Sequence, residues 1–224
     1  REMISSISNS DFSKENFKFA TAKEVDISNI KLWAQRISYV GELGYELYVE
    51  VNDAKKIYNL IVEKGEKYKI SNCGMHAMDI MRMESGFLHW GHDISPEENQ
   101  YEAGLNFAVS YKKNIDFIGK DALLKIKNQK LSKQFVMLSL KNSKPGEPLL
   151  LHDEPIYLED KIIGQTTSGN YSFNFKKNFA FGYVSTEISI ADLAKKALFI
   201  EVEKKKYPSE MILKPLNFKD IKNI

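Results

Sequence analysis

By its sequence, the chain turns back on itself within the segment Arg36-Ile37-Ser38-Tyr39-Val40-Gly41-Glu42-Leu43-Gly44-Tyr45-Glu46-Leu47. Its two glycines, three residues apart, let the backbone turn tightly and approach a ligand, because glycine adopts conformations that other residues avoid. After the turn, alternation predicts a strand at residues 45–49. Tyr45, Leu47 and Val49 share one face of it, and Glu46 and Tyr48 share the other. The pattern predicts a hairpin with one apolar face and one polar face.

The residues on either side predict more strands and two helices. Alternation and β-branched residues indicate strands at residues 24–27 and 32–40. A helix capped by Asn52 or Asp53 would carry an apolar stripe, and a second helix is expected at residues 74–84, with Met75, Met78 and Met81 at core spacing. Farther on we expect a polar loop at residues 89–100, a strand at 107–111 and a short helix around Ala122.

The second half of the chain has a different pattern. From Phe135 onward the sequence predicts strands and turns with little helix, including a hairpin of residues 156–158 and 161–163. A polar, charged connector precedes this change near residue 130. We therefore expect an α+β fold. Residues 1–128 would form an α/β domain with an antiparallel sheet, and residues 132–224 an all-β domain of barrel or jelly-roll type.

Composition excludes several classes of protein. The chain of 224 residues carries 32 Lys and Arg against 30 Asp and Glu, a formal net charge of +2, which argues against a nucleic-acid binder. No apolar run approaches the roughly 20 residues that span a bilayer, so no membrane partner is expected. The single cysteine, Cys73, excludes an internal disulfide and favours a reducing, cytoplasmic location. We read it as a buried or indifferent thiol rather than a nucleophile.

The candidate binding residues lie beside the turn. Glu42 and Glu46 flank the two glycines, and a carboxylate at the start of a strand accepts two parallel hydrogen bonds from a planar edge with two donors. Arginine offers such an edge, and so does the amino-pyrimidinone edge of a pterin. The alternative interpretation is a hairpin with solvated glutamates, since glutamates are mostly exposed.

Residues 77–93 hold a second group of polar side chains. Asp79 and Arg82 stand three apart on the expected helix and are spaced to form a surface pair. His89, His92 and Asp93 lie in the polar loop rather than on one helix face, so we predict no metal site. The sequence contains neither a P-loop nor a Gly-x-Gly-x-x-Gly fingerprint, so it carries no nucleotide-binding motif for flavin or nicotinamide.

These segments together resemble a known family. The motifs at residues 36–46, 79–87, 164–169 and 181–184 occur in the order and at the distances seen in aminomethyltransferases, the T-protein of the glycine cleavage system. The loop at residues 89–94 and the segment 102–105 look closer still to the folate-binding C-terminal half of flavin-dependent dimethylglycine and sarcosine dehydrogenases. The resemblance extends from Arg1 to about Val202.

The resemblance implies binding of tetrahydrofolate and transfer of a one-carbon unit. In the dehydrogenases, flavin oxidises an N-methyl group and tetrahydrofolate captures the carbon as 5,10-methylenetetrahydrofolate. The family glutamate that holds the pterin corresponds to Glu46, with Glu42 a weaker candidate. The catalytic residues stay unknown from the sequence, and the folate-binding set that we expect from the resemblance is Glu46, Tyr39, Tyr48, Glu42, Arg82 and Trp90.

The sequence departs from the family at two positions. Met78 stands where T-proteins usually have an arginine that contacts folate, and Arg82 is the more structural arginine of that motif. The aspartate implicated in folate chemistry lies far upstream of the glutamate in the family, and neither Asp11 nor Asp26 has a matching context. We therefore expect a fragment that lacks one side of the folate cavity. Such a fragment would bind folate weakly or not at all, with FAD confined to a missing N-terminal part of the parent polypeptide.

The sequence leaves several functions open. The expected function is the tetrahydrofolate-dependent module of an enzyme that demethylates N-methylglycines. One alternative is a stand-alone aminomethyltransferase of glycine cleavage, and another is a non-catalytic folate-binding regulatory protein. A soluble protein of unrelated role is the remaining interpretation. The sequence does not select between dimethylglycine, sarcosine and another N-methyl amine, because that choice would be made at the flavin.

Overall fold

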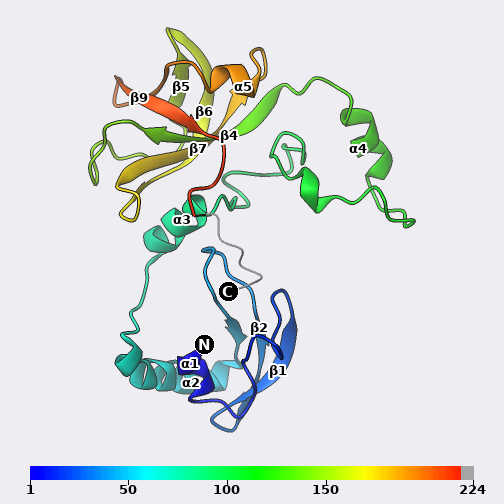
Figure 1. The fold of residues 1–224 in the computed structure, drawn as a ribbon, viewed down its shortest axis with the longest axis vertical. Helices are drawn as coiled ribbons and strands as arrows, with labels where there is room; N and C mark the ends of the chain where they lie inside the picture. Colours follow the sequence, from blue (N-terminus) through cyan, green and yellow to red (C-terminus); the bar gives the residue numbers. More distant parts are fainter. Residues whose placement is uncertain (218–224) are drawn as a thin grey trace. The chain divides into compact units, whose positions relative to one another are not determined.

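The computed structural model describes residues 1–217, which form two compact units. The first comprises Arg1–Ser85 together with Asn217, and the second comprises Gly86–Leu216 (Figure 1). The predicted boundary near residue 130 coincides with the start of the first barrel strand at Lys133, whereas the division between compact units falls after Ser85.

The first unit combines a small antiparallel sheet with helices. Its three strands pair in chain order, which confirms the predicted antiparallel hairpins. The second strand is shorter than expected, because it ends before the turn-forming segment. The elements are α1 (Glu2–Ser5), β1 (Ala22–Ile27), β2 (Ile30–Gln35), β3 (Glu46–Tyr48), α2 (Val51–Gly65), the 3-10 turn η1 (Glu66–Tyr68) and α3 (Met75–Glu84).

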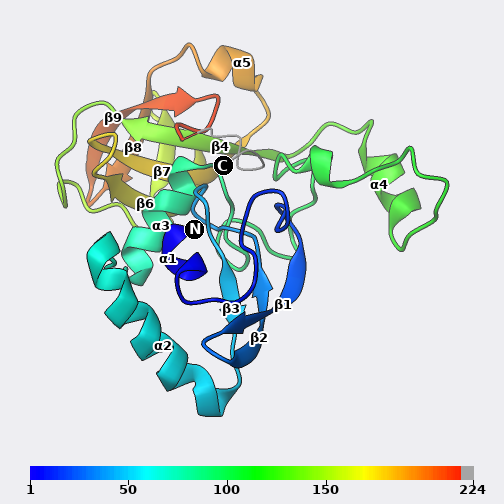
Figure 2. The same ribbon diagram turned by 60° about the horizontal axis from the view of Figure 1, so that its bottom comes forward.

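One face of this sheet is buried under α2. Ile57, Leu60 and Ile61 of the helix, the predicted apolar stripe, pack into one core with the inward residues of all three strands. Figure 2 shows α2 and the three strands of this unit as ribbons. Tyr45, Leu47 and Val49 belong to this core, so the predicted alternation along β3 is confirmed. The residues that alternate with these along each strand point to the other face of the sheet. None of them belongs to the core cluster among the described residues.

The second unit contains a closed antiparallel barrel, as the sequence predicted. Its strands follow the order β4-β7-β6-β5-β8-β9 around the barrel. Leu138, Leu140, Ile156 and Ile200 are fully buried inside it. The strands are β4 (Lys133–Leu140), β5 (Pro155–Leu158), β6 (Lys161–Ser172), β7 (Lys177–Ser185), β8 (Leu198–Val202) and β9 (Lys205–Ile212), with the short helix α5 (Ile190–Leu193) between β7 and β8.

Two glycines allow β6 and β7 to approach closely. A Cβ added at Gly164 would lie 1.9 Å from the carbonyl oxygen of Tyr183, and one added at Gly182 would lie 2.4 Å from that of Gln165. Neither position tolerates a side chain without a shift of the backbone. The two motif segments 164–169 and 181–184 are therefore neighbours in the barrel wall.

The structure corrects several sequence-based expectations. Residues 107–111 are not a strand, because this segment overlaps the 3-10 turn η2 (Asn106–Ala108). It lies in the long connection before β4, which also contains α4 (Lys120–Ile126) (Figure 1). Met75 is 69% exposed, and Met78 and Met81 are only half-buried. The buried residues of α3 are Ile80, which the spacing also indicated, and Arg82, Met83 and Glu84. Cys73 is exposed, so of the two expected environments the buried one is wrong. No helix in the described part of the chain is long and apolar enough to cross a membrane.

Candidate functional site

The uncovered face of the three-stranded sheet holds the main candidate residues. Trp33 lies opposite Tyr48, and Gln35 lies opposite Glu46, so these four side chains form one cross-strand patch, which we call the open sheet face. Trp33 is 56% exposed and Tyr48 is 52% exposed. Large aromatic side chains on a solvent-facing sheet are unusual without a function in binding, because they bury much apolar area when a partner covers them.

Glu46 and Tyr48 are joined on this face. The Tyr48 hydroxyl donates a hydrogen bond of 2.6 Å to Oε2 of Glu46, and it is the only group among residues 1–217 that does so. This bond raises the pKa of Tyr48, because the carboxylate stabilises the protonated phenol. A carboxylate has about four lone-pair sites, so Glu46 keeps acceptor positions for two further donors.

Trp33 and Tyr48 also line a shallow hollow of about 380 Å³ beside the patch. Glu24, Lys31 and Glu50 contribute its polar rim, and Glu24 pairs with Lys31 at 3.3 Å. Glu46 is adjacent to this hollow on β3 but is not part of its lining. The first unit therefore offers a carboxylate next to an aromatic surface, rather than a carboxylate at the bottom of a cavity.

The remaining predicted residues of this unit are partly buried. Tyr39 and Glu42 lie in the turn between β2 and β3, half-buried, and both interact with neighbouring groups. Arg36, at the start of the turn, is 2% exposed and donates from Nη1 to the carbonyl of Phe17 at 2.7 Å. The buried guanidinium thus ties the start of the turn to the segment between α1 and β1.

Arg82 has a structural environment. Its side chain is 1% exposed and donates from Nε and Nη2 to Oδ1 of Asp79, at 2.9 and 2.7 Å. The predicted pairing of these two residues is confirmed, although the arginine is buried rather than on the surface. Met78, the residue in place of the family arginine, is half-buried on the same helix. Contact of Arg82 with folate stays a prediction.

A buried aspartate organises the loop at residues 89–94 in the second unit. Asp93 is 1% exposed, and its carboxylate accepts hydrogen bonds from Thr167 Oγ1 at 2.6 Å, Ser168 Oγ at 2.8 Å and the backbone N–H of His89 at 2.9 Å. The Tyr183 hydroxyl donates to its backbone carbonyl at 2.8 Å. Burial raises the pKa of Tyr183. The two barrel motifs therefore serve to hold this loop.

The same loop carries Trp90, which is 65% exposed. The rings of His89 and His92 lie 4.6 Å apart. No group of three or more metal-ligating side chains occurs within residues 1–217. The sequence pattern gave no signal for Trp33 as a binding residue or for Asp93 as a partner of Thr167 and Ser168. Trp33 is recognised only from the strand register, which sets it opposite Tyr48. Asp93 is recognised only from its contact with Thr167, which is distant in the sequence.

The structure therefore brings two of the predicted residues into direct contact. Glu46 and Tyr48 touch, and Tyr39 and Glu42 lie in the turn that leads to them. Trp90 belongs to the second unit and is fixed there by the Asp93 network.

Comparison with known families decides the identity of this fold. Residues 1–113 match the family model described as the GCVT N-terminal domain, and residues 133–217 match the glycine cleavage T-protein C-terminal barrel domain. The chain belongs to the glycine cleavage T-protein family. Both matched regions correspond to features described above, the sheet with Glu46 and the six-stranded barrel.

Several curated relatives of this T-protein-family chain are dehydrogenases or aminomethyltransferases. The human mitochondrial dimethylglycine dehydrogenase is 37% identical over 96% of the chain, but the chain spans only 24% of that protein. An aminomethyltransferase of Listeria welshimeri is 33% identical over 96% of the chain and 56% of the relative. The mouse mitochondrial sarcosine dehydrogenase is 29% identical, with 82% of the chain and 20% of the relative covered.

A solved structure supports the same fold. The aminomethyltransferase T of the glycine cleavage system from Bartonella henselae matches with a TM-score of 0.72 at 24% identity, covering 83% of this chain and 49% of that one. The mixed fold with antiparallel sheets and a closed barrel is therefore that of an aminomethyltransferase.

Proposed function

We propose that this T-protein-family chain is the tetrahydrofolate-dependent module of an enzyme that demethylates N-methylglycines. In this proposal, tetrahydrofolate receives the carbon of an oxidised N-methyl group and leaves as 5,10-methylenetetrahydrofolate. Membership in the family supports an enzyme of the aminomethyltransferase type. The similarity to dimethylglycine and sarcosine dehydrogenases, over nearly the whole chain for the former, supports the demethylating role.

The observation that carries the proposal is the placement of Glu46. It lies on the open sheet face with acceptor positions available, next to the exposed aromatic pair Trp33 and Tyr48. The amino-pyrimidinone edge of a pterin presents two parallel N–H donors, which a carboxylate accepts as a bidentate pair. The flat ring would at the same time cover aromatic area. The residues present therefore fit the head group of tetrahydrofolate.

The open sheet face covers only one side of such a ligand. In our proposal, another part of the same polypeptide covers the other side, excludes water from the reacting carbon and supplies the flavin. The flavin, when bound there, would oxidise the N-methyl group. Residues of this chain would then orient folate and hold its pterin in one protonation state. The coverage of 24% of the dimethylglycine dehydrogenase relative is compatible with this division.

Product analysis tests the proposal. The complete polypeptide that contains this chain would be incubated with dimethylglycine or sarcosine, with and without tetrahydrofolate. We expect 5,10-methylenetetrahydrofolate with the cofactor and free formaldehyde without it. Absence of both products from both amines would reject the demethylating role.

A stand-alone aminomethyltransferase of glycine cleavage is the second candidate. The match to the Listeria welshimeri aminomethyltransferase, 33% identical over 96% of the chain, favours it. It would transfer a methylene carbon from a protein-bound aminomethyl group, so it would need no flavin and would leave free N-methylglycines unchanged. The same incubation therefore distinguishes the two functions.

A further inference from the structure

One end of the barrel carries a hollow with an excess of positive charge. It has a volume of about 770 Å³ and lies between the loop after β4, the β6–β7 turn and the β8–β9 hairpin. Its lining includes five lysines against two glutamates, a net charge of three positive, which exceeds the +2 of the whole chain. The lysines are Lys141, Lys144, Lys176, Lys177 and Lys205. We call this region the basic hollow.

The loop that carries two of these lysines is held rigidly by the barrel. The backbone N–H of Lys141 donates to Pro208 at 3.0 Å, and Ser143 Oγ accepts from the backbone N–H of Asn178 at 2.9 Å. The buried Asn178 side chain donates to the carbonyl of Pro148, also at 2.9 Å. Lys144 and Glu147 exchange two backbone hydrogen bonds. The loop is thus held by backbone bonds and by the side chains of Ser143 and Asn178, and the bonds named here involve no lysine side chain.

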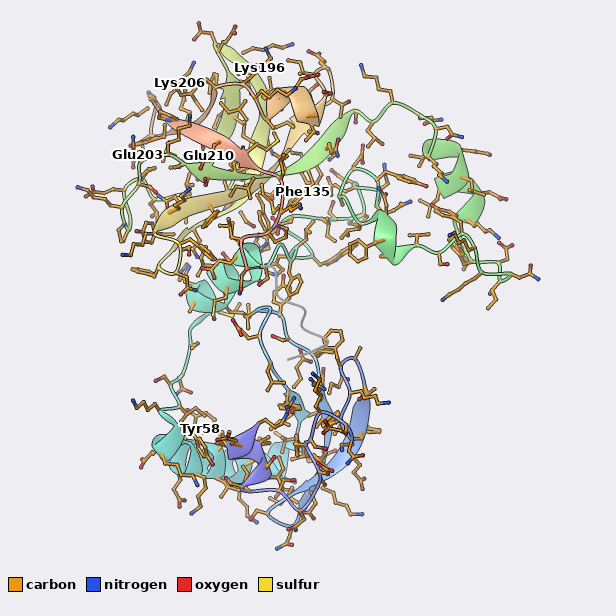
Figure 3. All side chains as sticks on the ribbon, in the orientation of Figure 1. Tyr58, Phe135, Lys196, Glu203, Lys206 and Glu210 are labelled. Carbon is orange, nitrogen blue, oxygen red and sulfur yellow. The ribbon has the colours of Figure 1, made fainter. Side chains whose placement is uncertain are left out.

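The positive charge of the basic hollow is only partly compensated. Lys177 pairs with Glu210 at 3.1 Å, and Lys205 lies over the Tyr207 ring at 5.0 Å. Lys141 interacts electrostatically with the same Glu210, whereas Lys144 and Lys176 form no ion pair or hydrogen bond through their side chains within residues 1–217. Figure 3 labels Glu203, which lines the hollow, and Glu210, the partner of Lys177. A concave surface of one charge concentrates oppositely charged ligands.

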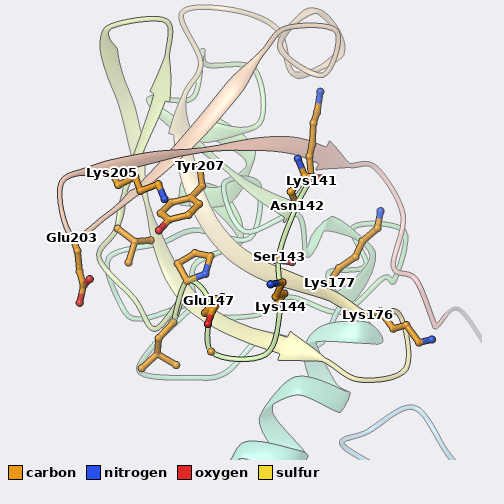
Figure 4. A pocket seen from close by; sticks show the side chains of 14 residues that line it. Lys141, Asn142, Ser143, Lys144, Glu147, Lys176, Lys177, Glu203, Lys205 and Tyr207 are labelled. Carbon is orange, nitrogen blue, oxygen red and sulfur yellow. The ribbon is translucent and has the colours of Figure 1, made fainter.

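The walls of the basic hollow differ in chemistry. Figure 4 places Lys205 and the Tyr207 ring on one side and the segment from Lys141 to Lys144 on the other, while Lys176 and Lys177 extend beyond that segment. Pro148, Leu149 and Val202 add apolar surface. Lys144 and Lys205 are therefore placed to contact a ligand directly, and Lys176 and Lys177 act on it through their charge.

We propose that the basic hollow binds a small multivalent anion whose phosphate or carboxylate groups are attached to an aromatic body. The anionic groups would lie between Lys144 and Lys205, and the aromatic body would pack on Tyr207 and the apolar wall. The residues that line this site all belong to the second unit, and none of them is part of the open sheet face.

Calorimetric titration of the whole chain with defined probes tests this site. The probes are adenosine triphosphate, benzene-1,3,5-tricarboxylate, inorganic triphosphate and adenosine, all without divalent cations. We expect saturable binding of one aromatic polyanion per chain, weaker binding of inorganic triphosphate, and no measurable binding of adenosine. The tighter of the two aromatic polyanions identifies the preferred anionic group. Failure of both to saturate would overturn the proposal.

Charge-reversal variants distinguish a specific anion site from nonspecific attraction of anions to a lysine-rich surface. The double substitution Lys144→Glu and Lys205→Glu should weaken binding about tenfold or more, whereas Lys125→Glu on α4 should change it less than about twofold. Tyr207→Leu should reduce the preference for the aromatic polyanion over inorganic triphosphate. Equal weakening by the Lys125 control would overturn the proposal. If the double variant fails to fold, Lys144→Glu alone replaces it, because the loop is held by its backbone.

Discussion

The Tyr48 hydroxyl donates a hydrogen bond of 2.6 Å to the Glu46 carboxylate, and both side chains lie on the uncovered face of the β1–β3 sheet. This bond orients the carboxylate along the strand and occupies part of one oxygen. The remaining acceptor positions point to a ligand with a planar donor edge. The relation between these two residues links the hairpin of residues 36–47 to the proposed folate site.

The first prediction concerns the titration of Tyr48. Its pKa is raised by the hydrogen bond to Glu46, because loss of the proton breaks the bond and places two negative charges side by side. In Glu46→Gln the phenol should therefore ionise at lower pH, near the ordinary tyrosine value. Carbon-13 NMR of ring-labelled tyrosine measures this directly. An unchanged Tyr48 pKa in the variant would show that the two side chains do not interact in solution.

A second prediction concerns the buried Asp93. Asp93→Ala removes the buried carboxylate that accepts from the hydroxyls of Thr167 and Ser168 and from the N–H of His89, so we expect a loss of about 2–4 kcal/mol in the free energy of unfolding. Urea denaturation measures the loss. Asp121→Ala, at an exposed position of α4, is the matched control and should cost less than about 1 kcal/mol. Equal costs would mean that the network adds nothing to stability.

Close packing of β6 against β7 gives the third prediction. Gly182→Ala places a methyl group 2.4 Å from the Gln165 carbonyl oxygen, so the strands must separate, at a cost of about 2 kcal/mol or more. Gly74→Ala meets no atom within 4 Å and should stay within about 0.5 kcal/mol of the parent. Thermal unfolding of the two variants provides the comparison. A Gly182 variant as stable as the Gly74 variant contradicts the close approach.

Lys133 and Glu98 provide a prediction for pH dependence. Burial raises the pKa of Glu98, but the hydrogen bonds from Lys133 and Ser95 outweigh burial, and the net pKa lies below its ordinary value. Because the folded-state pKa is depressed, the pair stabilises the fold above the unfolded-state pKa. This contribution disappears as the pH falls through the folded-state value.

The variant Lys133→Met tests the direction of this pH dependence. The difference in unfolding free energy between the parent and this variant should be largest near neutral pH and should shrink as the pH falls below the ordinary glutamate value. Lys125→Met, an exposed substitution on α4, should show no such trend. If the difference in unfolding free energy between parent and variant instead increased toward acid pH, the lowered pKa of Glu98 would be contradicted.

The local pattern of the chain was sufficient to predict much of the fold. Alternation along β3 placed Leu47 inside and Glu46 outside, and the stripe on α2 identified its buried side, because both depend on the period of a single element. The change near residue 130 indicated the barrel. The strand β9 was not predicted, since its lysine-rich start and Pro208 obscure the alternation, and the buried position of Arg82 depends on its neighbours in space.

The candidate site was less predictable than the fold. Glu46 and Tyr48 followed from the strand pattern and the family resemblance, but Trp33 became a candidate only through the register that sets it opposite Tyr48. Thr167 and Ser168 lie 74 and 75 residues from Asp93 along the chain, so no local pattern connects them. The basic hollow likewise joins three separate segments of the barrel.

The affinity of the complete polypeptide for tetrahydrofolate, compared between the parent and Glu46→Gln, tests the central claim most directly. Glutamine keeps the size of the side chain but presents an N–H₂ to the donor edge of the pterin, so we predict binding weaker by about tenfold or more. Glu63→Gln on α2 is the control and should bind as the parent does. Equal affinity of the parent and Glu46→Gln would contradict the assignment of Glu46 as the residue that holds the pterin.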